Sequence, residues 1–365
     1  MGDVVLWIVV GTALAFDFTN GFHDTANAVA TSISTRAMPP KVAVTLAAVL
    51  NFVGAFLSLA VAATIASGIV QADLITPSIV FAGLIGAITW NLATWYFGLP
   101  SSSSHALIGG VVGSAFVAEG PDAVLGAGII EKVVVPGLVA PVLALVVTAI
   151  AISLAYRVVG RRRPGPVTRG FRLGQIVSGS LFSLSHGTND AQKTMGIIFL
   201  TLIANGNLTV SDEVPTWVVV SSATAIALGT YVGGWRIIKT MGSRIIKMDP
   251  AQGFTAQTVG ATVILSASHV GFPLSTTQVI SGSIMGAGAA KRLSAVRWGV
   301  AGNIAIAWVL TLPASAAVGG LTYAVVALFG ADDAGPLVVA GLLLVALGVA
   351  FTRRLAAGRT LTAEV

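Results

Sequence analysis

The sequence predicts an all-α integral membrane protein, with about ten to twelve transmembrane helices in two inverted repeats that include broken or re-entrant helices. Three observations lead to this prediction. Of the 365 residues, 55% are hydrophobic and only 9% are charged, whereas a soluble domain carries about 25% charged residues. Long apolar runs follow one another along the chain, and four polar motifs recur among them as two pairs.

The apolar runs give the expected helices in order, since one crossing takes roughly 20 residues. Two runs contain polar clusters, at residues 17–31 and 185–194. Two others open with proline and hydroxyl side chains, as half-helices do. The runs cover residues 4–31, 41–66, 78–97, 100–117, 132–156, 173–203, 215–238, 252–270, 272–290, 297–320 and 337–353.

Basic residues mark the loops on the cytoplasmic side of a membrane protein. If the N-terminus lies outside, every Lys and Arg except Lys132 and Lys193 falls on the inner side. We therefore expect a multi-pass protein of the plasma (inner) membrane, surrounded by the lipid bilayer, with a cytoplasmic C-terminus. The net charge of +6 reflects this topology, so no nucleic-acid partner is expected.

Two pairs of motifs indicate an internal repeat. Gly21-Phe-His-Asp24 aligns with Gly187-Thr-Asn-Asp190, and Pro100-Ser-Ser-Ser-Ser104 aligns with Pro273-Leu-Ser-Thr-Thr277. The charge pattern sends the segments of Asp24 and Asp190 across the membrane in opposite directions, so the repeats are expected to be inverted. Glycines at GxxxG spacing, which suits close helix packing, follow the second pair of motifs: Gly109, Gly113, Gly282 and Gly286.

The repeats divide the chain into four expected parts. Residues 1–158 form the first inverted repeat, 159–172 a basic cytoplasmic linker, 173–353 the second inverted repeat and 354–365 a cytoplasmic tail. Inverted repeats with broken helices place the binding site of a transporter where the two halves meet, near the membrane centre.

The two hydroxyl runs suit the binding of an anion. Pro100 and Pro273 stop the preceding helices, and the next helix N-termini offer free N–H groups and the positive end of the dipole. Hydroxyl groups add donors without adding charge. The alternative is that these hydroxyls only join helices to one another or bond to nearby carbonyls.

Three carboxylates, Asp17, Asp24 and Asp190, lie inside the expected spans. A charge at the bilayer centre costs about 2.5–3.5 kcal/mol or more, so such residues indicate function. The alternative is a structural ion pair with Lys193, a residue that either contacts the anion or neutralises an acid. Asp17 has no counterpart in the second repeat. Amide oxygens suited to a hard cation come from Asn20, Asn27 and Asn189.

Acids beside an anion site are expected to hold cations that travel with the anion. Moving one charge against 100 mV costs about 2.3 kcal/mol, so a divalent anion entering the cell needs about two positive companions. This arithmetic favours symport. His23 and His186 flank the acids and could relay protons, and the spacing of the histidines does not indicate zinc.

The motifs resemble those of the inorganic phosphate transporter (PiT) family along nearly the whole chain. Residues 20–28 and 185–193 are similar to its paired signature motifs, and residues 98–105 and 273–278 to its paired hydroxyl motifs. The resemblance implies phosphate uptake with a co-transported cation by alternating access, often as a homodimer, without a cofactor and without enzymatic activity. The implied phosphate-binding residues are Ser102, Ser103, Ser104, Ser275, Thr276, Thr277, Asn27 and Asn189. The implied coupling-ion residues are Asp24 and Asp190. The chemistry of the neighbouring side chains adds Asn20 and His23 to the expected coupling-ion residues, with no separate metal site.

Gly21-Phe-His-Asp24 differs from the Gly-Ala-Asn-Asp of the sodium-coupled members. It resembles the bacterial low-affinity branch, which implies proton coupling or uptake of phosphate as a magnesium or calcium complex, while sodium stays open. Gln278 stands where that branch often has His.

Two other functions remain open at this point. A sulfate permease of the same fold would need much the same anion site. A passive anion channel would need no acids in the membrane, so Asp24 and Asp190 count against it. No catalytic constellation is present, which argues against an enzyme.

Overall fold

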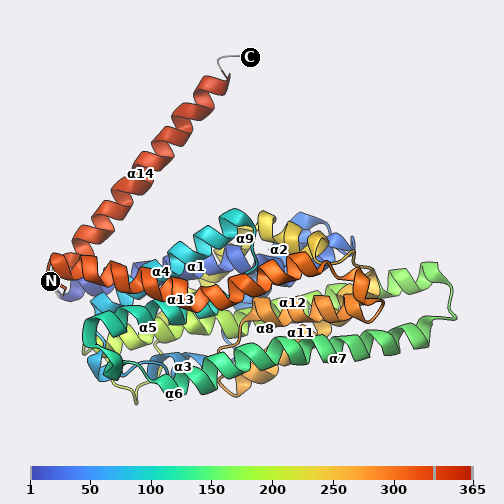
Figure 1. Ribbon diagram of the computed structural model, residues 1–365, viewed down its shortest axis with the longest axis horizontal. Coiled ribbons are helices and arrows are strands. Elements are labelled where there is room, and N and C mark those ends of the chain that lie inside the picture. Colours follow the sequence, from blue (N-terminus) through green and yellow to red (C-terminus); the bar gives the residue numbers. More distant parts are fainter. Residues whose placement is uncertain (1, 332–333, 363–365) are drawn as a thin grey trace.

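The computed structural model describes residues 2–331 and 334–362 (Figure 1). In these two ranges the chain forms α-helices and short helical turns but no β-strand, apart from an isolated bridge between Val70 and Val124. The helices are α1 (Gly2–Ser34), α2 (Pro40–Gly54), α3 (Ala60–Ser67), α4 (Pro77–Phe97), α5 (Ser103–Glu119), α6 (Gly126–Ile129), α7 (Val135–Val159), α8 (Pro164–Ala204), α9 (Thr216–Val232), α10 (Trp235–Lys239), α11 (Pro250–His269), α12 (Thr276–Ala289), α13 (Trp298–Leu328) and α14 (Gly335–Thr362). The short turns are η1 (Ala72–Leu74), η2 (Pro121–Ala123), η3 (Ile130–Val134), η4 (Thr240–Arg244) and η5 (Leu293–Ala295).

The all-α prediction is confirmed. Among the described helices, four are long and apolar enough to span a bilayer by length and composition, and a fifth results if α9 and the segment 235–244, bent by 59°, count as one. The longest helix, α8, is not among them because polar residues occupy its middle. The expected ten to twelve crossings therefore stay a prediction.

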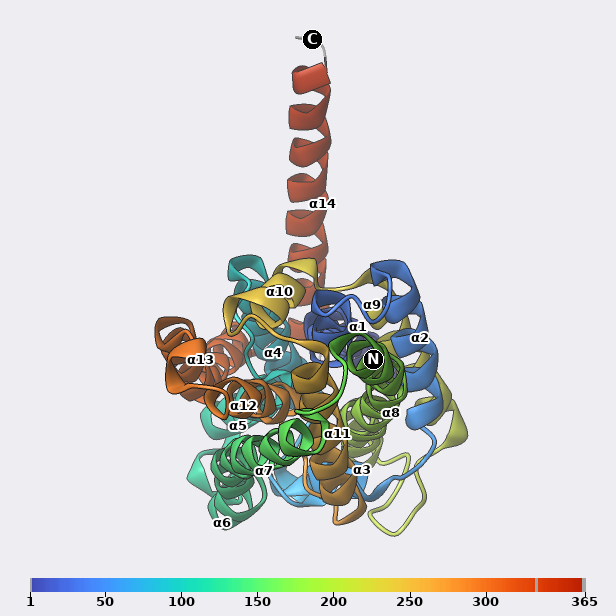
Figure 2. The ribbon, with the colours of Figure 1, turned by 90° about the vertical axis from the view of Figure 1, so that its right-hand side faces the viewer.

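All helices but one pack into a single elongated bundle, while α14 leaves it and extends away in both views (Figures 1 and 2). Several of its closest helix pairs join the two predicted halves: α1 packs on α9, α2 on α8, α5 on α13 and α7 on α12. The halves therefore interlock. Between α7 and α8 only residues 160–163 lie outside helices, so the predicted linker is helical from Pro164 onward, and the domain boundaries stay a prediction.

Two clusters of buried apolar side chains lie at the two ends of α1 and α8, the motif helices, which carry the two acidic motifs. In α1, Val5 to Phe16 belong to the first cluster and Ala26 to Ala30 to the second. In α8 the order is reversed, since Phe182 belongs to the second cluster and Ala191 to Leu202 belong to the first. The two motif helices thus run in opposite directions, as inverted repeats require, and their polar segments lie between the clusters.

The GxxxG glycines make the close packing that the sequence predicts. A Cβ on Gly113 would lie 2.0 Å from the carbonyl oxygen of Ala316 in α13, and a Cβ on Gly286 would lie 2.1 Å from that of Leu145 in α7. Such a Cβ has no room, so glycine is what lets each pair of backbones touch. The long helices α7 and α13 are thereby held against the helices that follow the two breaks.

Both predicted helix breaks are present. The first begins at Gly98, whose φ of +66° is left-handed, and its freed carbonyls are bound, because Thr240 Oγ1 donates to Gly98 O at 2.8 Å and Trp308 Nε1 donates to Pro100 O at 3.1 Å. The second contains Gly271, with a φ of +79°. Each break ends with a new helix whose N-terminus points into the polar region between the two apolar clusters.

Candidate functional site

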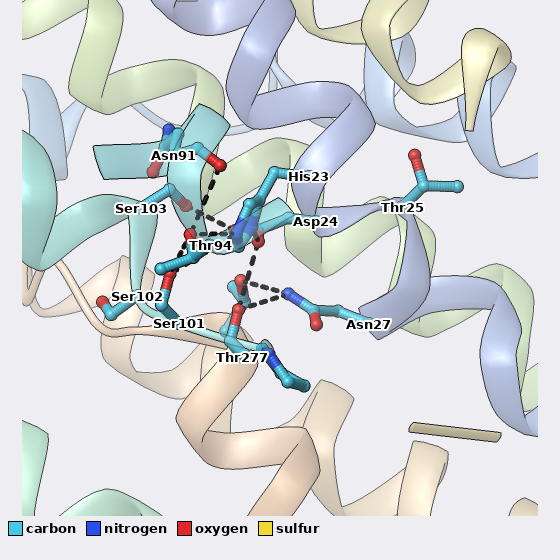
Figure 3. A network of polar contacts seen from close by, with 12 residues as sticks. His23, Asp24, Thr25, Asn27, Asn91, Thr94, Ser101, Ser102, Ser103 and Thr277 are labelled. Atoms are coloured by element: carbon cyan, nitrogen blue, oxygen red, sulfur yellow. Dashed lines mark hydrogen bonds and ion pairs between the residues drawn. The ribbon is translucent and has the colours of Figure 1, made fainter. Parts of the chain in front are cut away.

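Four helices bring their polar motif residues to one place. α1 carries the first acidic motif and α8 the second, while α5 and α12 begin there with their hydroxyl runs. Figure 3 shows the motif residues of α1 beside those of α5 and α12. The twelve residues predicted for the site are all buried, with at most 2% of the surface of any of them exposed. Such burial requires the polar groups to satisfy one another or a ligand.

Asp24 joins the starts of both broken helices (Figure 3). Ser103 Oγ donates to Asp24 Oδ2 at 2.5 Å and Thr277 Oγ1 donates to Asp24 Oδ1 at 3.2 Å. His23 Nδ1 lies 2.6 Å from Asp24 Oδ1. One carboxylate from the first half is therefore bound by a hydroxyl from each half, which couples the two hydroxyl runs through α1.

Asp190 has the corresponding place in α8, with one addition. Thr276 Oγ1 donates to Asp190 Oδ2 at 3.1 Å, and His186 Nε2 lies 3.0 Å from the same oxygen. Lys193 Nζ forms an ion pair with Asp190 Oδ1 and also donates to Ser104 Oγ and, at 2.9 Å, to the carbonyl of Leu274. The ammonium group is thus surrounded by three oxygens and neutralises Asp190.

The two asparagines tie the motif helices to the second break. Asn27 Nδ2 donates to the hydroxyls of Thr276, at 3.2 Å, and Thr277, at 2.9 Å. Asn189 Nδ2 donates to Ser268 Oγ at 2.8 Å and to the carbonyl of Phe272 at 3.3 Å. The side-chain oxygens of both asparagines are buried without a hydrogen-bond partner, so each is free to accept from a ligand or to bind a cation.

Two of the six predicted hydroxyls cap helices. Ser102 Oγ accepts from the backbone N–H of His105 at 3.1 Å, and Ser275 Oγ accepts from that of Gln278 at 3.3 Å. Each therefore fixes the first turn of its helix. The four hydroxyls that contact the acids or Lys193 are Ser103, Ser104, Thr276 and Thr277.

The remaining coupling-ion residues are His23, which lies on the α4 side of the site, and Asn20, which lies nearer the start of α1 than Asp24. His23 Nε2 lies 3.1 Å from Thr94 Oγ1 and 3.4 Å from Ser101 Oγ, next to the first break (Figure 3). Asn20 lies one turn before Asp24, and its side-chain oxygen is buried without a partner. The contact with Thr94 had no signal in the sequence, because a threonine near a helix end is common.

The two acids also approach one another. Asp24, Asp190 and His186 each offer a ligand atom, all within 4.8 Å of one another and all buried. Two carboxylates and an imidazole at this spacing could hold a cation. His186 was not among the predicted site residues, although its place four residues before Asp190 puts both on one helix face.

The arrangement combines groups for both signs of charge. Two helix N-termini, four hydroxyl groups and the ammonium of Lys193 favour an anion. Two carboxylates and the free amide oxygens favour a cation. A buried site that can neutralise an anion with a cation is what a coupled transporter requires.

Comparisons with known proteins agree with this geometry. Residues 20–319 match the phosphate transporter family. A protein of Mycobacterium tuberculosis named "Probable low-affinity inorganic phosphate transporter" is 55% identical over 327 residues, covering 89% of this chain and 78% of the relative. A protein of Rhizobium meliloti with the same name is 50% identical over 320 residues, covering 86% of this chain and 94% of the relative.

A solved structure titled "The sodium-dependent phosphate transporter" has a similar fold. It superposes with a TM-score of 0.81 at 26% identity, covering 89% of this chain and 99% of the other. The resemblance drawn from the motifs, including that to the bacterial low-affinity branch, is confirmed. The chain therefore belongs to the phosphate transporter family and is a multi-pass transporter of the plasma membrane, not an enzyme.

Proposed function

We propose that this protein takes up inorganic phosphate together with a cation, by alternating access. The observation that carries the proposal is the bonding of Asp24 and Asp190 to hydroxyls at the starts of two broken helices, deep inside the bundle. The names of the relatives, which are phosphate transporters, support phosphate over sulfate.

The phosphate would bind between the two helix starts. In the proposal its oxygens accept from Ser103, Ser104, Thr276 and Thr277, replacing bonds that these hydroxyls now make with the acids and the Leu274 carbonyl. Ser102 and Ser275 hold the helix N-termini in place through their caps. Asn27 and Asn189 present free side-chain oxygens, which can accept a hydrogen bond from a protonated phosphate oxygen but not from sulfate.

The cation would bind at the acids. Asp24, Asp190, Asn20 and His23 form the proposed coupling-ion site, and the position of His186 adds it to this set. Lys193 already neutralises Asp190, so Asp24 is the acid whose charge a mobile cation would balance. The ion is a proton, or a magnesium or calcium ion carried with the phosphate, or sodium, and no resident cofactor takes part.

In alternating access, one group of helices, including a helix that follows a break, would move against the rest of the bundle. The close glycine contacts make α5 with α13, and α12 with α7, two stiff pairs, and the acids link their ends. The proposal includes a homodimer and an N-terminus outside the cell, with residues 1–158 and 173–353 as the two inverted repeats and residues 354–365 as the cytoplasmic tail.

The test is uptake of labelled phosphate into proteoliposomes under an imposed proton or sodium gradient, with excess sulfate as competitor. Asp24→Asn and Asp190→Asn are measured beside Asp122→Asn, a control at an exposed acid of the short turn η2. We expect uptake driven by one cation gradient, insensitive to sulfate, lost in the two buried variants and kept in the control. Loss of uptake with sulfate would identify a sulfate permease. Uptake indifferent to both gradients and to both buried variants would identify a channel.

A further inference from the structure

Polar side chains continue along α1 beyond Asp24. Asn27, Thr31 and Thr35 follow it at spacings of three or four residues, which place them on one face of the helix. Thr35 lies directly after the last residue of α1, about 16 Å from Asp24 along the helix axis. These four residues are buried, with at most 4% of the surface of any of them exposed. A buried row of polar residues therefore leads from the acids to the end of α1.

α8 carries a matching row that leads to the same end of the bundle. His186, Ser183 and Gln175 precede Asp190 by four, seven and fifteen residues, which places them on one face of α8. All are buried. Because α1 and α8 pack against each other and run in opposite directions, the two rows meet again beyond the acids. There Thr35 Oγ1 donates to Gln175 Oε1 at 2.6 Å.

A glutamine of α11 joins the two rows. Gln257 Nε2 donates to the carbonyl oxygen of Ala28 at 2.9 Å and to Ser32 Oγ at 3.1 Å. Ser178 Oγ donates to Gln257 Oε1 at 3.3 Å. α1, α8 and α11 are thus connected here by uncharged polar side chains. We call these residues the amide–hydroxyl cluster: Ser32, Thr35, Gln175, Ser178 and Gln257.

Two glycines make room for the amides of this cluster. A Cβ on Gly179 would lie 3.0 Å from Gln257 Nε2, and a Cβ on Gly253 would lie 2.2 Å from Gln175 Nε2. Even so, Gln175 Nε2 and the adjoining Thr31 Oγ1 are buried without a hydrogen-bond partner, whereas buried polar groups are normally paired. The cluster therefore has hydrogen-bonding capacity left for a ligand.

The opposite end of α1 is built differently. From Val5 to Phe16 its buried side chains are all apolar, and they belong to the first apolar cluster. An ion that passed through such packing would lose its hydration without replacement. At the amide–hydroxyl cluster, bonds between side chains can be exchanged for bonds to an anion or to water, which costs little net free energy. No fixed charge of the cluster would repel the anion or hold it.

We propose that the amide–hydroxyl cluster is a transit site for the phosphate ion, on a path between α1 and α8 from the acids to the face where α1 ends. The path is closed in this structure, since the side chains of the cluster bond to one another. When the helices separate at this end, the hydroxyls and amide N–H groups donate to the phosphate oxygens. The inference rests on the proposed function, because it names the route by which transported phosphate reaches one face of the protein.

The test uses the absence of cysteine from the chain, since a single introduced thiol can then be modified alone. Ser32→Cys and Ser178→Cys are treated with a membrane-impermeant thiol reagent that carries an ethylsulfonate group, an oxyanion like phosphate. Intact cells present one face to the reagent and inside-out vesicles the other. Lys41→Cys marks the face where α1 ends, because Lys41 is exposed at the start of α2. Ser114→Cys is the matched control, since Ser114 is a buried serine whose hydroxyl already donates to Ile79 O at 2.8 Å.

We expect Ser32→Cys and Ser178→Cys to react from the same face as Lys41→Cys, and Ser114→Cys to react from neither face. Excess phosphate on both sides of the membrane should slow the reaction of the two cluster variants several-fold and leave that of Lys41→Cys unchanged. Modification of Ser32→Cys should abolish phosphate uptake by that variant, because the attached sulfonate fills the path.

Three results would overturn the proposal. They are no reaction of folded Ser32→Cys and Ser178→Cys from the Lys41 face, reaction only from the opposite face, and reaction at a rate that phosphate does not change. Elution as a single species and thermal unfolding show that each variant is folded, and either cluster variant alone decides the outcome. The modification itself requires no uptake. A wild type that takes up no phosphate would therefore count against the proposed function, whereas uptake with unreactive cluster variants would count against the path alone.

Discussion

Lys193 leads to a specific prediction about how many positive charges cross the membrane with each phosphate. Lys193 is buried, with only 1% of its surface exposed. Its ammonium group contacts the Asp190 carboxylate, the Ser104 hydroxyl and the Leu274 carbonyl. Three oxygens of these kinds would also suit a bound cation. The aligned position in the first repeat is Asn27, so Lys193→Asn replaces the lysine by a side chain that the other half already uses.

The magnitude follows from the lost ion pair. Breaking a buried pair by removing one partner costs about 3–5 kcal/mol, so the variant should be less stable unless a mobile cation takes the place of the ammonium. If a cation does so, one more positive charge crosses with each phosphate. At 100 mV that charge is worth about 2.3 kcal/mol, or about a 40-fold change in the phosphate gradient the transporter can sustain.

The assay measures the membrane potential at which net phosphate flux is zero, in proteoliposomes whose potential is set with valinomycin and potassium. Lys193→Asn should shift this potential by the amount expected for one additional charge, and added sodium should raise its melting temperature. Lys291→Asn is the control, since Lys291 lies on the surface, 3.6 Å from Asp249. Lys193→Arg keeps the charge and should keep the wild-type potential.

Either of two results would refute this reasoning. If Lys193→Asn transports phosphate with an unchanged zero-flux potential, the ammonium does not take the place of a cation and serves only to hold Asp190. A variant that is inactive but folded, with a melting temperature indifferent to sodium, would count against it equally.

Changes away from the acids should act through packing and hydrogen bonding. Gly113→Val should destabilise the protein by at least about 1–3 kcal/mol through overpacking, measured by thermal unfolding in detergent, whereas Gly299→Val should not, because nothing lies within 4 Å of a Cβ there. Thr240→Val should cost about 1–3 kcal/mol and slow phosphate uptake, because the carbonyl at the first helix break loses its donor; uptake at the wild-type rate would contradict this. Tyr156→Phe should lower stability by about 1 kcal/mol, since the tyrosine hydroxyl donates to Asp249 Oδ2 at 2.6 Å, and chemical unfolding measures the loss.

The helix breaks and the buried acids could be predicted from the sequence because both depend on local chemistry. A proline followed by hydroxyl residues ends one helix and starts the next wherever it stands. A carboxylate in an apolar run is costly enough to indicate function alone. The close packing at Gly113 and Gly286 could also be predicted. Each of them follows another glycine, Gly109 or Gly282, by four residues, and this spacing puts both glycines of a pair on one face of their helix.

Other parts of the site could not be predicted, because they depend on how distant helices pack. Nothing in the sequence shows that Thr94 contacts His23, or that Thr240 binds the carbonyl of Gly98. The approach of His186 to Asp24 depends on the crossing of α1 and α8. The sequence also cannot show that Ser102 and Ser275 serve as caps while their neighbours contact the acids, since all are hydroxyl residues in one run.

The interlocking of the halves has a consequence for biosynthesis. The ribosome adds about 5–20 residues per second, so α1 waits roughly 10 to 40 s for its neighbour α9, about 200 residues later, to emerge. Throughout that time the Asp24 carboxylate of α1 lacks its partner Thr277, because α12 follows α9 in the chain. The insertion machinery or a chaperone is expected to shield the nascent first half in the interval. A chain truncated before α8 should be recognised by membrane proteases and degraded.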